Sequence, residues 1–165
     1  MSSSTAPSNF GWKSAWLVGQ AQLDREHQEF AELIAALQAA SDGSLSQCLD
    51  AVISHAIAHF GQEDAWMRRL DFPAQQCHMA EHAAVLRSAA GVRQLLRQGD
   101  AQPARRFATE LAAWFPPHVQ HLDSALAAWI CKQTWNAKPL VFQRRSHLET
   151  APSAPAMTAM AHPLV

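Results

Sequence analysis

The chain carries histidine and carboxylate pairs at a spacing that suits metal binding. His59 and Glu63 are four residues apart, and His78 and His82 repeat that interval. On a helix, residues four apart project from the same face one turn apart, so both members of a pair can approach one ion. Imidazole nitrogen and carboxylate oxygen are ligands for several transition metals. The two pairs therefore indicate metal binding, although a solvated His–Glu pair has the same spacing.

Three further residues are less regular. His118 and Asp123 are five residues apart, about 140° around an ideal helix, which is less natural for two ligands of one ion. A carboxylate that bridges two ions can still reach. His27 stands alone beside apolar residues, and a single histidine in that setting usually makes a structural hydrogen bond. Each group taken alone is more often structural than functional.

The complete set favours a metal centre. Each of four expected helices carries a histidine near its middle, and two of these helices add a carboxylate. Burying so many ionisable groups is costly unless they are neutralised and bonded, which a pair of metal ions would do. Helical bundles build such sites from side chains on facing helices. Seven residues are therefore candidate metal ligands: His27, His59, Glu63, His78, His82, His118 and Asp123.

The donor types narrow the choice of metal. The set contains no thiolate, which excludes a cysteine-rich zinc site or an iron–sulfur site. Its nitrogen and oxygen donors suit iron, manganese, copper or zinc. Seven side chains are too many for one tetrahedral zinc ion, but they suit two ions of higher coordination number that share bridging ligands. The donor types alone do not select iron.

Helical periodicity places these residues on four helices. Apolar residues recur at steps of three and four along each stretch, which is typical of one buried helical face. Asp24 is a favourable N-cap for the first helix, and Gly99 is a plausible residue to follow the third. No stretch alternates with a period of two, so the expected fold is all-α, an up-down-up-down antiparallel four-helix bundle. The expected helices span about residues 24–40, 44–70, 74–98 and 103–134.

Two prolines interrupt the fourth helix. Pro116 and Pro117 have no N–H to donate, so a regular helix should not run straight through them. Either one long helix kinks between Trp114 and His118, or a new helix starts at the prolines. The kink is favoured because the apolar stripe continues on both sides of the pair. A bend could aim His118 at its ion, or it could be a tolerated distortion.

Composition excludes several classes of protein. Of the 165 residues, 16% are charged and the formal net charge is −1, so there is no basic field to hold nucleic acid. The apolar runs are too short to cross a bilayer, and the first residues do not resemble a secretion signal. Three widely spaced cysteines indicate free thiols. We expect a cytoplasmic protein that binds neither nucleic acid nor membrane.

Four segments resemble one known family in their order and internal spacing. The chain contains in turn VGQAQLDREHQEF, HFGQEDAWM, HMAEH and WFPPHVQHLD. This series is similar to the hemerythrin family, specifically its bacterial single-domain members, over about residues 16–132. The resemblance implies two non-haem iron ions, bridged by an oxo or hydroxo group and two carboxylates, that bind molecular oxygen reversibly. The Ser-, Gly- and Trp-rich start without helical periodicity predicts an extended arm (1–22), and the low-complexity end predicts a flexible C-terminal tail (136–165). Between them lies the expected hemerythrin-like four-helix di-iron domain (23–135).

The same resemblance gives each ligand a role. His78, His82 and His118 would hold one iron, while His27 and His59 would hold the other. Glu63 and Asp123 would bridge them. The iron with two histidines would keep an open position for oxygen, since a ligand needs a vacant coordination site. Residues that could form a dry pocket, or that could be ordinary core residues, are Phe30, Phe60, Met67, Trp114 and Phe115.

Two other histidines are expected to lie outside the ligand set. His55 shares a helical stripe with His59 and Glu63, so spacing alone does not exclude it. The family pattern selects the histidine directly before Phe60, and that is the reason for choosing His59. His121 follows His118 by three residues. Asp64 stands where the family usually has a second glutamate, which is not a ligand.

Oxygen is the expected ligand, for storage, delivery or sensing, and an enzyme is not expected. One alternative is a di-iron oxidase, peroxidase or nitric-oxide-handling catalyst. Such oxidases are rich in carboxylates and Glu-x-x-His pairs, whereas this set is rich in histidine. Another alternative is a redox-sensing or oxygen-sensing interaction module. No output domain is evident, and the identity of a protein partner stays open.

Overall fold

All the regular secondary structure of the described residues is helical. The computed structural model describes residues 10–136, and this range contains helices and turns but no strand. Residues 1–9 of the expected arm and 137–165 of the expected tail lie outside the described residues. The elements are η1 (Ser14–Trp16), α1 (Ala21–Ala39), α2 (Leu45–Arg69), α3 (Gln75–Arg97), α4 (Gln102–His118), η2 (Val119–Asp123) and α5 (Ser124–Trp135).

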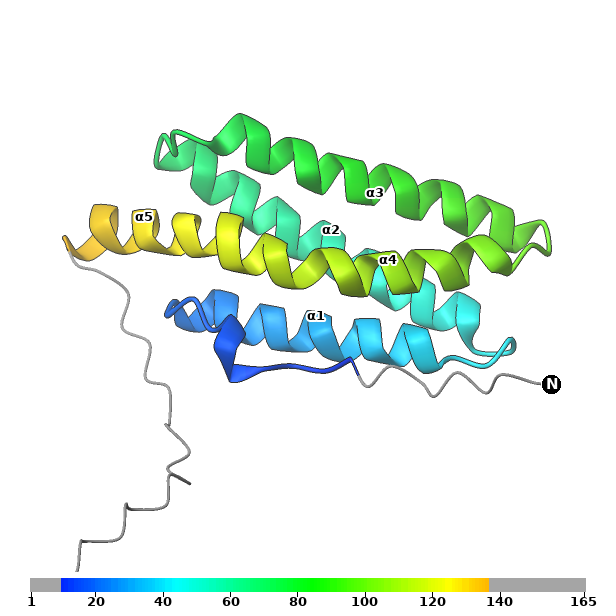
Figure 1. The fold of residues 1–165 in the computed structure, drawn as a ribbon. Helices are drawn as coiled ribbons and strands as arrows, with labels where there is room; N and C mark the ends of the chain where they lie inside the picture. The colour runs from blue at the N-terminus through cyan, green and yellow to red at the C-terminus, as the bar shows by residue number, and fades with distance from the viewer. Residues whose placement is uncertain (1–9, 137–165) are drawn as a thin grey trace, which may run out of the picture.

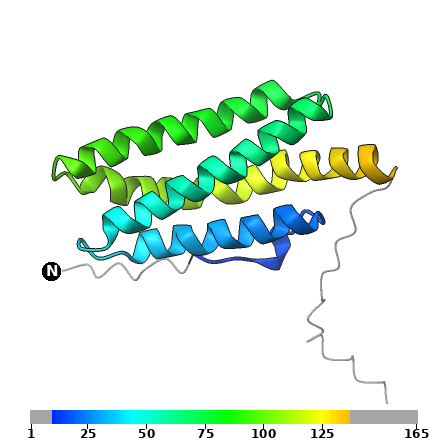
Figure 2. The ribbon, with the colours of Figure 1, turned by 180° about the vertical axis from the view of Figure 1, so that it is seen from behind.

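The helices form an antiparallel four-helix bundle, as predicted. Helix α4 continues through the π-helical turn η2 into α5, and together they make the fourth rod of the bundle (Figure 1). Helix α1 packs against α2 and α4, and α3 packs against the same two neighbours. Seen from behind, α1 and α2 run side by side in opposite directions (Figure 2). Each helix therefore presents one face to a shared interior.

The apolar stripes of the sequence form that interior. On α1 the buried residues recur at three- and four-residue steps, from Leu23 through Phe30 and Ile34 to Leu37, and His27 lies on the same face. Helix α2 buries a longer stripe that includes His59 and Glu63. Because the same faces bury apolar residues and the candidate ligands, the hydrophobic packing also brings the ionisable side chains into the core.

The start of α1 differs from the prediction. The N-cap is Gln20, whose side-chain oxygen accepts a hydrogen bond from the Leu23 N–H at 2.7 Å. The prediction that Asp24 fills this role was wrong, because Asp24 lies one turn inside the helix. Its carboxylate instead accepts hydrogen bonds from the N–H groups of Val18 and Gly19, at 2.8 and 3.2 Å. Asp24 thus fastens the preceding segment to the first turn of α1.

The proline pair lies within α4 and is followed by an irregular turn. Both Pro116 and Pro117 lie inside α4, so the alternative in which a new helix begins at the prolines is wrong. The hydrogen-bond pattern changes after His118, where η2 forms a π-helical turn over Val119–Asp123. Missing proline N–H groups weaken the regular ladder, and a wider turn with bonds between residues five apart is one way to absorb that defect.

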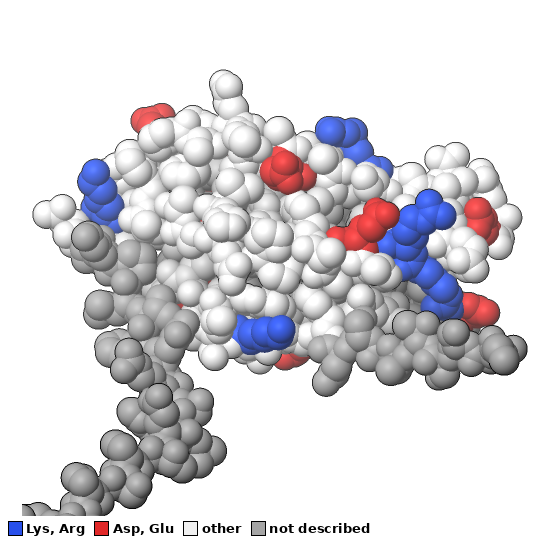
Figure 3. Space-filling view, viewed as in Figure 1, with Lys and Arg blue, Asp and Glu red and all other residues white. Residues whose placement is uncertain are grey.

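Surface features agree with the composition. None of the helices in residues 10–136 is both long enough and apolar enough to cross a membrane. On the face shown in Figure 3, acidic and basic residues are scattered singly and in small groups of mixed sign. This face therefore has no extended basic field of the kind that binds nucleic acid.

Candidate metal centre

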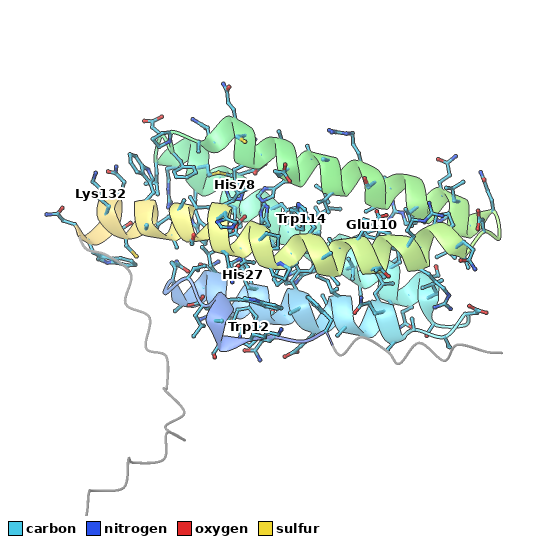
Figure 4. All side chains as sticks on the ribbon, in the orientation of Figure 1. Trp12, His27, His78, Glu110, Trp114 and Lys132 are labelled. Atoms are coloured by element: carbon cyan, nitrogen blue, oxygen red, sulfur yellow. The ribbon has the colours of Figure 1, made fainter. Side chains whose placement is uncertain are left out.

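The structure brings all seven predicted ligands together in the core of the bundle. Helix α1 contributes one residue, α2 and α3 contribute two each, and the fourth rod contributes two. The exposed fraction of each is 5% or less. Figure 4 shows His27 on α1 and His78 on α3, two of the helices that surround the site. The residues are His27, His59, Glu63, His78, His82, His118 and Asp123.

One set of donors is the two-histidine group, formed by His27, His59 and one oxygen from each carboxylate. Glu63 Oε1 lies 3.9 Å from His27 Nε2 and 3.6 Å from His59 Nε2. Asp123 Oδ2 lies 3.0 Å from His27 Nε2. These atoms are close enough to surround one cation.

The second set is the three-histidine group, formed by His78, His82, His118 and the other carboxylate oxygens. Glu63 Oε2 lies 3.6 Å from His78 Nε2 and 3.1 Å from His82 Nε2. Asp123 Oδ1 lies 3.0 Å from His78 Nε2 and 3.3 Å from His118 Nε2. The Nε2 atom of His118 is also 3.2 Å from those of His78 and His82.

The two carboxylates connect the groups. Glu63 and Asp123 each direct one oxygen at the two-histidine group and the other at the three-histidine group. Within each group the donor atoms all lie within 4.8 Å of one another. A carboxylate shared in this way could bridge two ions. The centre is asymmetric, because one group has an additional imidazole.

The π-helical turn accounts for the irregular spacing of His118 and Asp123. On an ideal α-helix, residues five apart diverge by about 140°. A π-helical turn closes between residues five apart, so it brings such residues onto one face. Here η2 begins directly after His118 and ends at Asp123, and the two side chains meet at 3.3 Å. This local widening lets both side chains enter the same donor group.

The buried polar atoms fit a bound cation. None of the four oxygens of Glu63 and Asp123 has a hydrogen-bond partner, although imidazole nitrogens lie within 3.0–3.9 Å. The contacts therefore lack the direction of hydrogen bonds, as expected for donors that converge on a common point. Buried carboxylates without partners are strongly destabilising. Metal ions between the groups would satisfy these oxygens and the facing imidazole nitrogens together.

The pKa shifts show that positive charge beside the buried carboxylates stabilises the site. Burial raises the pKa of Glu63, but the surrounding imidazoles outweigh it and lower that pKa to about 2. Burial lowers the pKa of His27, but the neighbouring carboxylates of Asp123 and Glu63 outweigh this effect and raise that pKa to about 9. Without a metal, the site would thus hold protons on imidazole to balance its carboxylates. Bound cations would supply the same charge.

Two carboxylates that the sequence did not single out support the donors. The His59 Nδ1–H donates to Glu26 Oε2 at 2.8 Å, and the His82 Nδ1–H donates to Asp64 Oδ1 at 3.0 Å. The His59 hydrogen bond also lowers the pKa of Glu26. Such bonds fix the imidazole tautomer and turn the opposite nitrogen toward the ion. Their only sequence signal is that Glu26 and Asp64 directly adjoin two candidate ligands.

The other two histidines belong to neither donor group among the described residues. The His55 Nε2–H donates to the backbone oxygen of Glu26 at 3.1 Å, and its ring contacts Phe30. Burial lowers the pKa of His55, with a contribution from the neighbouring His59. His121 is exposed on η2. His55 therefore holds the backbone of α1 beside His59.

Aromatic side chains surround the donors, as the sequence suggested. Phe60 stacks on His82 with ring centroids 4.1 Å apart, and Trp114 lies 4.1 Å from His118. Phe115 is 6.0 Å from His27. The sequence did not predict that Trp16, from the segment before α1, would pack on Phe115 with centroids 5.8 Å apart. Met67 is fully buried in the core.

Comparisons with known proteins agree with this geometry. The family described as Hemerythrin HHE cation binding domain matches residues 18–130. A bacteriohemerythrin of Ralstonia nicotianae is 37% identical over 127 residues, which cover 77% of this chain and 93% of that protein. A hemerythrin-like protein of Naegleria gruberi is 30% identical over 119 residues, covering 72% of this chain and 92% of the relative. No solved structure gives a significant match.

Proposed function

This chain belongs to the hemerythrin family, and on that basis we propose that it binds molecular oxygen reversibly at a non-haem di-iron centre. The observation that carries the proposal is the division of the buried donors into two groups connected by Glu63 and Asp123. Nitrogen and oxygen donors suit iron among other metals. Membership of the family favours iron over those alternatives.

We assign the ligands as follows within this proposal. His78, His82 and His118 would hold one iron, His27 and His59 would hold the other, and Glu63 and Asp123 would be shared between them. When bound, a pair of ferrous ions would supply the electrons for reversible oxygen binding. The two-histidine group has one donor fewer, and this supports an open position for oxygen on that side.

Aromatic side chains shield the two-histidine group from water. Phe30 is fully buried and its ring lies 5.4 Å from that of Phe115, which in turn faces His27. Such a dry, apolar wall limits the access of water and protons, which promote irreversible oxidation of the bound state. Glu26 holds the His59 imidazole through its Nδ1, so the ring cannot turn away from its ion.

A binding role is better supported than an enzymatic one. Di-iron oxidases in helical bundles use carboxylate-rich sites with Glu-x-x-His pairs. This sequence contains no Glu-x-x-His pair, and its two donor groups share only two carboxylates.

We also place the protein in the cytoplasm as part of this proposal, because Cys48, Cys77 and Cys131 are all free thiols.

The proposal is tested by spectroscopy of the reduced, iron-loaded protein. Exposure to air should produce a visible absorption band, and flushing with inert gas should remove it and restore the starting spectrum through repeated cycles. Iron analysis should give two ions per chain. A single ion, a preference for zinc in iron-rich growth, or irreversible oxidation in the first cycle would contradict the proposal. Steady consumption of oxygen with a reductant would instead support the enzymatic alternative.

A further inference from the structure

A pocket on the surface of the bundle reaches one of the proposed ligands. It has a volume of about 220 Å³ and lies between α3 and the junction of α4 with η2. His118 forms part of its wall, while Glu81 and His121 are exposed side chains that line it. The remaining lining residues are Trp114, Pro117 and Leu122. The pocket therefore joins solvent to the edge of the three-histidine group.

His118 is the donor with the least support. Its exposed fraction of 5% is the largest among the seven donors, and its Nδ1 has no hydrogen-bond partner. By contrast, carboxylates hold the Nδ1 atoms of His59 and His82. His27 and His78 also lack an Nδ1 partner, but both are fully buried and neither lines the pocket. His118 is thus the imidazole that can most readily turn toward solvent.

The backbone around His118 has the weakest hydrogen-bond pattern of the fourth rod. Pro116 and Pro117 precede it and donate no backbone hydrogen bond, and the π-helical turn η2 follows it. Local opening requires less free energy where regular backbone hydrogen bonds are missing. The same stretch of chain therefore combines a ligand whose Nδ1 has no hydrogen-bond partner with a backbone that lacks two regular hydrogen bonds.

Trp114 covers His118 and is held by Glu81. The Trp114 ring lies 4.1 Å from the His118 ring, and its Nε1–H donates to Glu81 Oε2 at 3.0 Å. In Figure 4, Trp114 lies between α3 and α4. A cation that binds Glu81 would compete with this hydrogen bond for the carboxylate. Capture of the cation and release of the tryptophan cover are therefore linked at one side chain.

We propose that ferrous ions enter the centre through the pocket beside His118, with Glu81 and His121 as their first ligands. A carboxylate and an imidazole suit a hydrated divalent transition-metal ion. The ion exchanges water for these two side chains and then for His118, whose ring turns back to carry it inward. No electron is transferred in these steps. This inference rests on the proposed metal centre and adds the route by which it is filled.

The test measures the rate of metal uptake by the metal-free full chain. Protein and limiting Fe²⁺ are mixed without oxygen, and a ferrous chelator traps the unbound iron at set times. The Glu81→Gln, His121→Gln double variant should take up iron about tenfold more slowly, because charged groups at such sites raise association rates by roughly 10- to 1,000-fold. The final iron content and the melting temperature of the loaded protein should stay unchanged, since both side chains are exposed.

Glu110→Gln is the matched control. Glu110 is an exposed carboxylate that lines a neighbouring pocket of about 210 Å³ with Trp114, but it does not border His118. The uptake rate of Glu110→Gln should equal that of the original protein.

Two further measurements test the cover and the charge. Trp114→Phe, which removes the hydrogen bond to Glu81, should accelerate uptake. High salt should slow the original protein toward the rate of the double variant.

The failure of this inference is distinct from failure of the proposed function. Equal uptake rates in the double variant and the original protein, at full final iron content, would overturn the route and leave the centre intact. A lower final iron content in the double variant would also overturn it, because Glu81 and His121 would then be permanent ligands. If the original chain bound no iron at all, the proposed function itself would be wrong.

Discussion

The two donor groups use the same kinds of ligand but have different surroundings. The two-histidine group lies behind Phe115, and the segment before α1 adds Trp16 as a further cover. The three-histidine group borders a surface pocket through His118 and lies on an irregular stretch of the fourth rod. Aromatic side chains pack on both groups, but only the three-histidine group has a ligand that lines this surface pocket.

This difference separates two requirements that a buried metal centre must meet. In the proposed function, bound oxygen would need a dry and rigid wall, while incoming metal would need a polar path and a ligand that can move. A single uniform shell of side chains would satisfy only one of them. The two sides differ because different elements border them: η1 and α4 contribute Trp16 and Phe115 to one side, and α4 and η2 contribute the proline pair and the π-helical turn to the other.

The largest expected effect comes from a residue that both groups share. Glu63→Ala removes an oxygen from each group at once, so both ions should be lost and the melting temperature should fall sharply. Metal analysis and thermal unfolding measure the two results. Gln38→Ala on α1 is a control, since Gln38 is not among the donors. Retention of two ions in Glu63→Ala would contradict the bridging role.

A smaller effect is expected when only one group is changed. His59→Ala removes a ligand of the two-histidine group and leaves all three imidazoles of the other group in place. The protein should therefore keep about one ion per chain. His55→Ala is the matched control, because His55 lies one turn earlier and bonds to the backbone of Glu26. If His55→Ala lost an ion while His59→Ala kept both, the assignment would be reversed.

Removing a supporting carboxylate should weaken binding without abolishing it. In Glu26→Gln the amide still reaches His59 Nδ1 but no longer carries charge. Loss of such a partner typically lowers metal affinity by about 10- to 100-fold. Competition with a chelator should show the loss for one ion only, the ion of the two-histidine group. Asp64→Asn should weaken the other ion through His82. Equal weakening of both ions in each variant would contradict the division into groups.

The stability of the metal-loaded protein should depend on pH differently from that of the metal-free protein. In the metal-free protein, the His27 pKa of about 9 lies above its ordinary 6.5, so its contribution to stability is complete below pH 6.5 and lost as pH rises through 9. The Glu63 pKa of about 2 lies below its ordinary 4.5, so its contribution is complete above pH 4.5 and lost as pH falls through 2. The metal-free site is therefore most stable in mild acid, between pH 4.5 and pH 6.5, where both contributions are complete.

Metal binding shows the opposite trend across neutral pH. Ions require neutral imidazoles, so their binding strengthens as pH rises, while the metal-free site becomes less stable. The difference in melting temperature between the loaded and metal-free proteins should grow from about pH 6 to about pH 9. Scanning calorimetry of both forms measures it. A difference that shrinks over this range would show that protons and metal do not compete for the same imidazoles.

Much of the site was predictable from sequence, because helical spacing and burial act on the same residues. The faces that bury Phe30 and Phe60 also carry His27 and His59, so periodicity alone places them in one core. The bundle and the convergence of the donors on α1, α2 and α3 follow from that relation, whereas His118 and Asp123 meet through the turn η2. The roles of the individual ligands came from resemblance to a family, and they stay predictions.

The remaining features depend on contacts that periodicity does not encode. The hydrogen bond from His59 to Glu26 joins two helices, so adjacency along the chain could not predict it. The turn η2 changes backbone hydrogen bonding without changing the apolar stripe, which led to the expectation of a kink before His118. Asp24 has a favourable capping side chain, but its carboxylate accepts hydrogen bonds from the backbone N–H groups of Val18 and Gly19 in the preceding segment.

The smallest expected effect tests the closed side of the centre. Trp16 is 6% exposed and lies against Phe115, which faces His27. In Trp16→Leu the aromatic cover is lost, so water should reach the two-histidine group more often and the oxygenated form should decay several-fold faster. Iron content should stay at two ions, because Trp16 contacts none of the described donors through a hydrogen bond or ion pair.

Trp135→Leu is the matched control, since Trp135 is 63% exposed and lies at the end of α5. Decay rates measured by the fading of the visible band should rank Trp16→Leu above both the control and the original protein. Equal rates would show that Phe115 and Phe30 alone exclude water, and that the segment before α1 contributes to packing but not to protection of the bound oxygen.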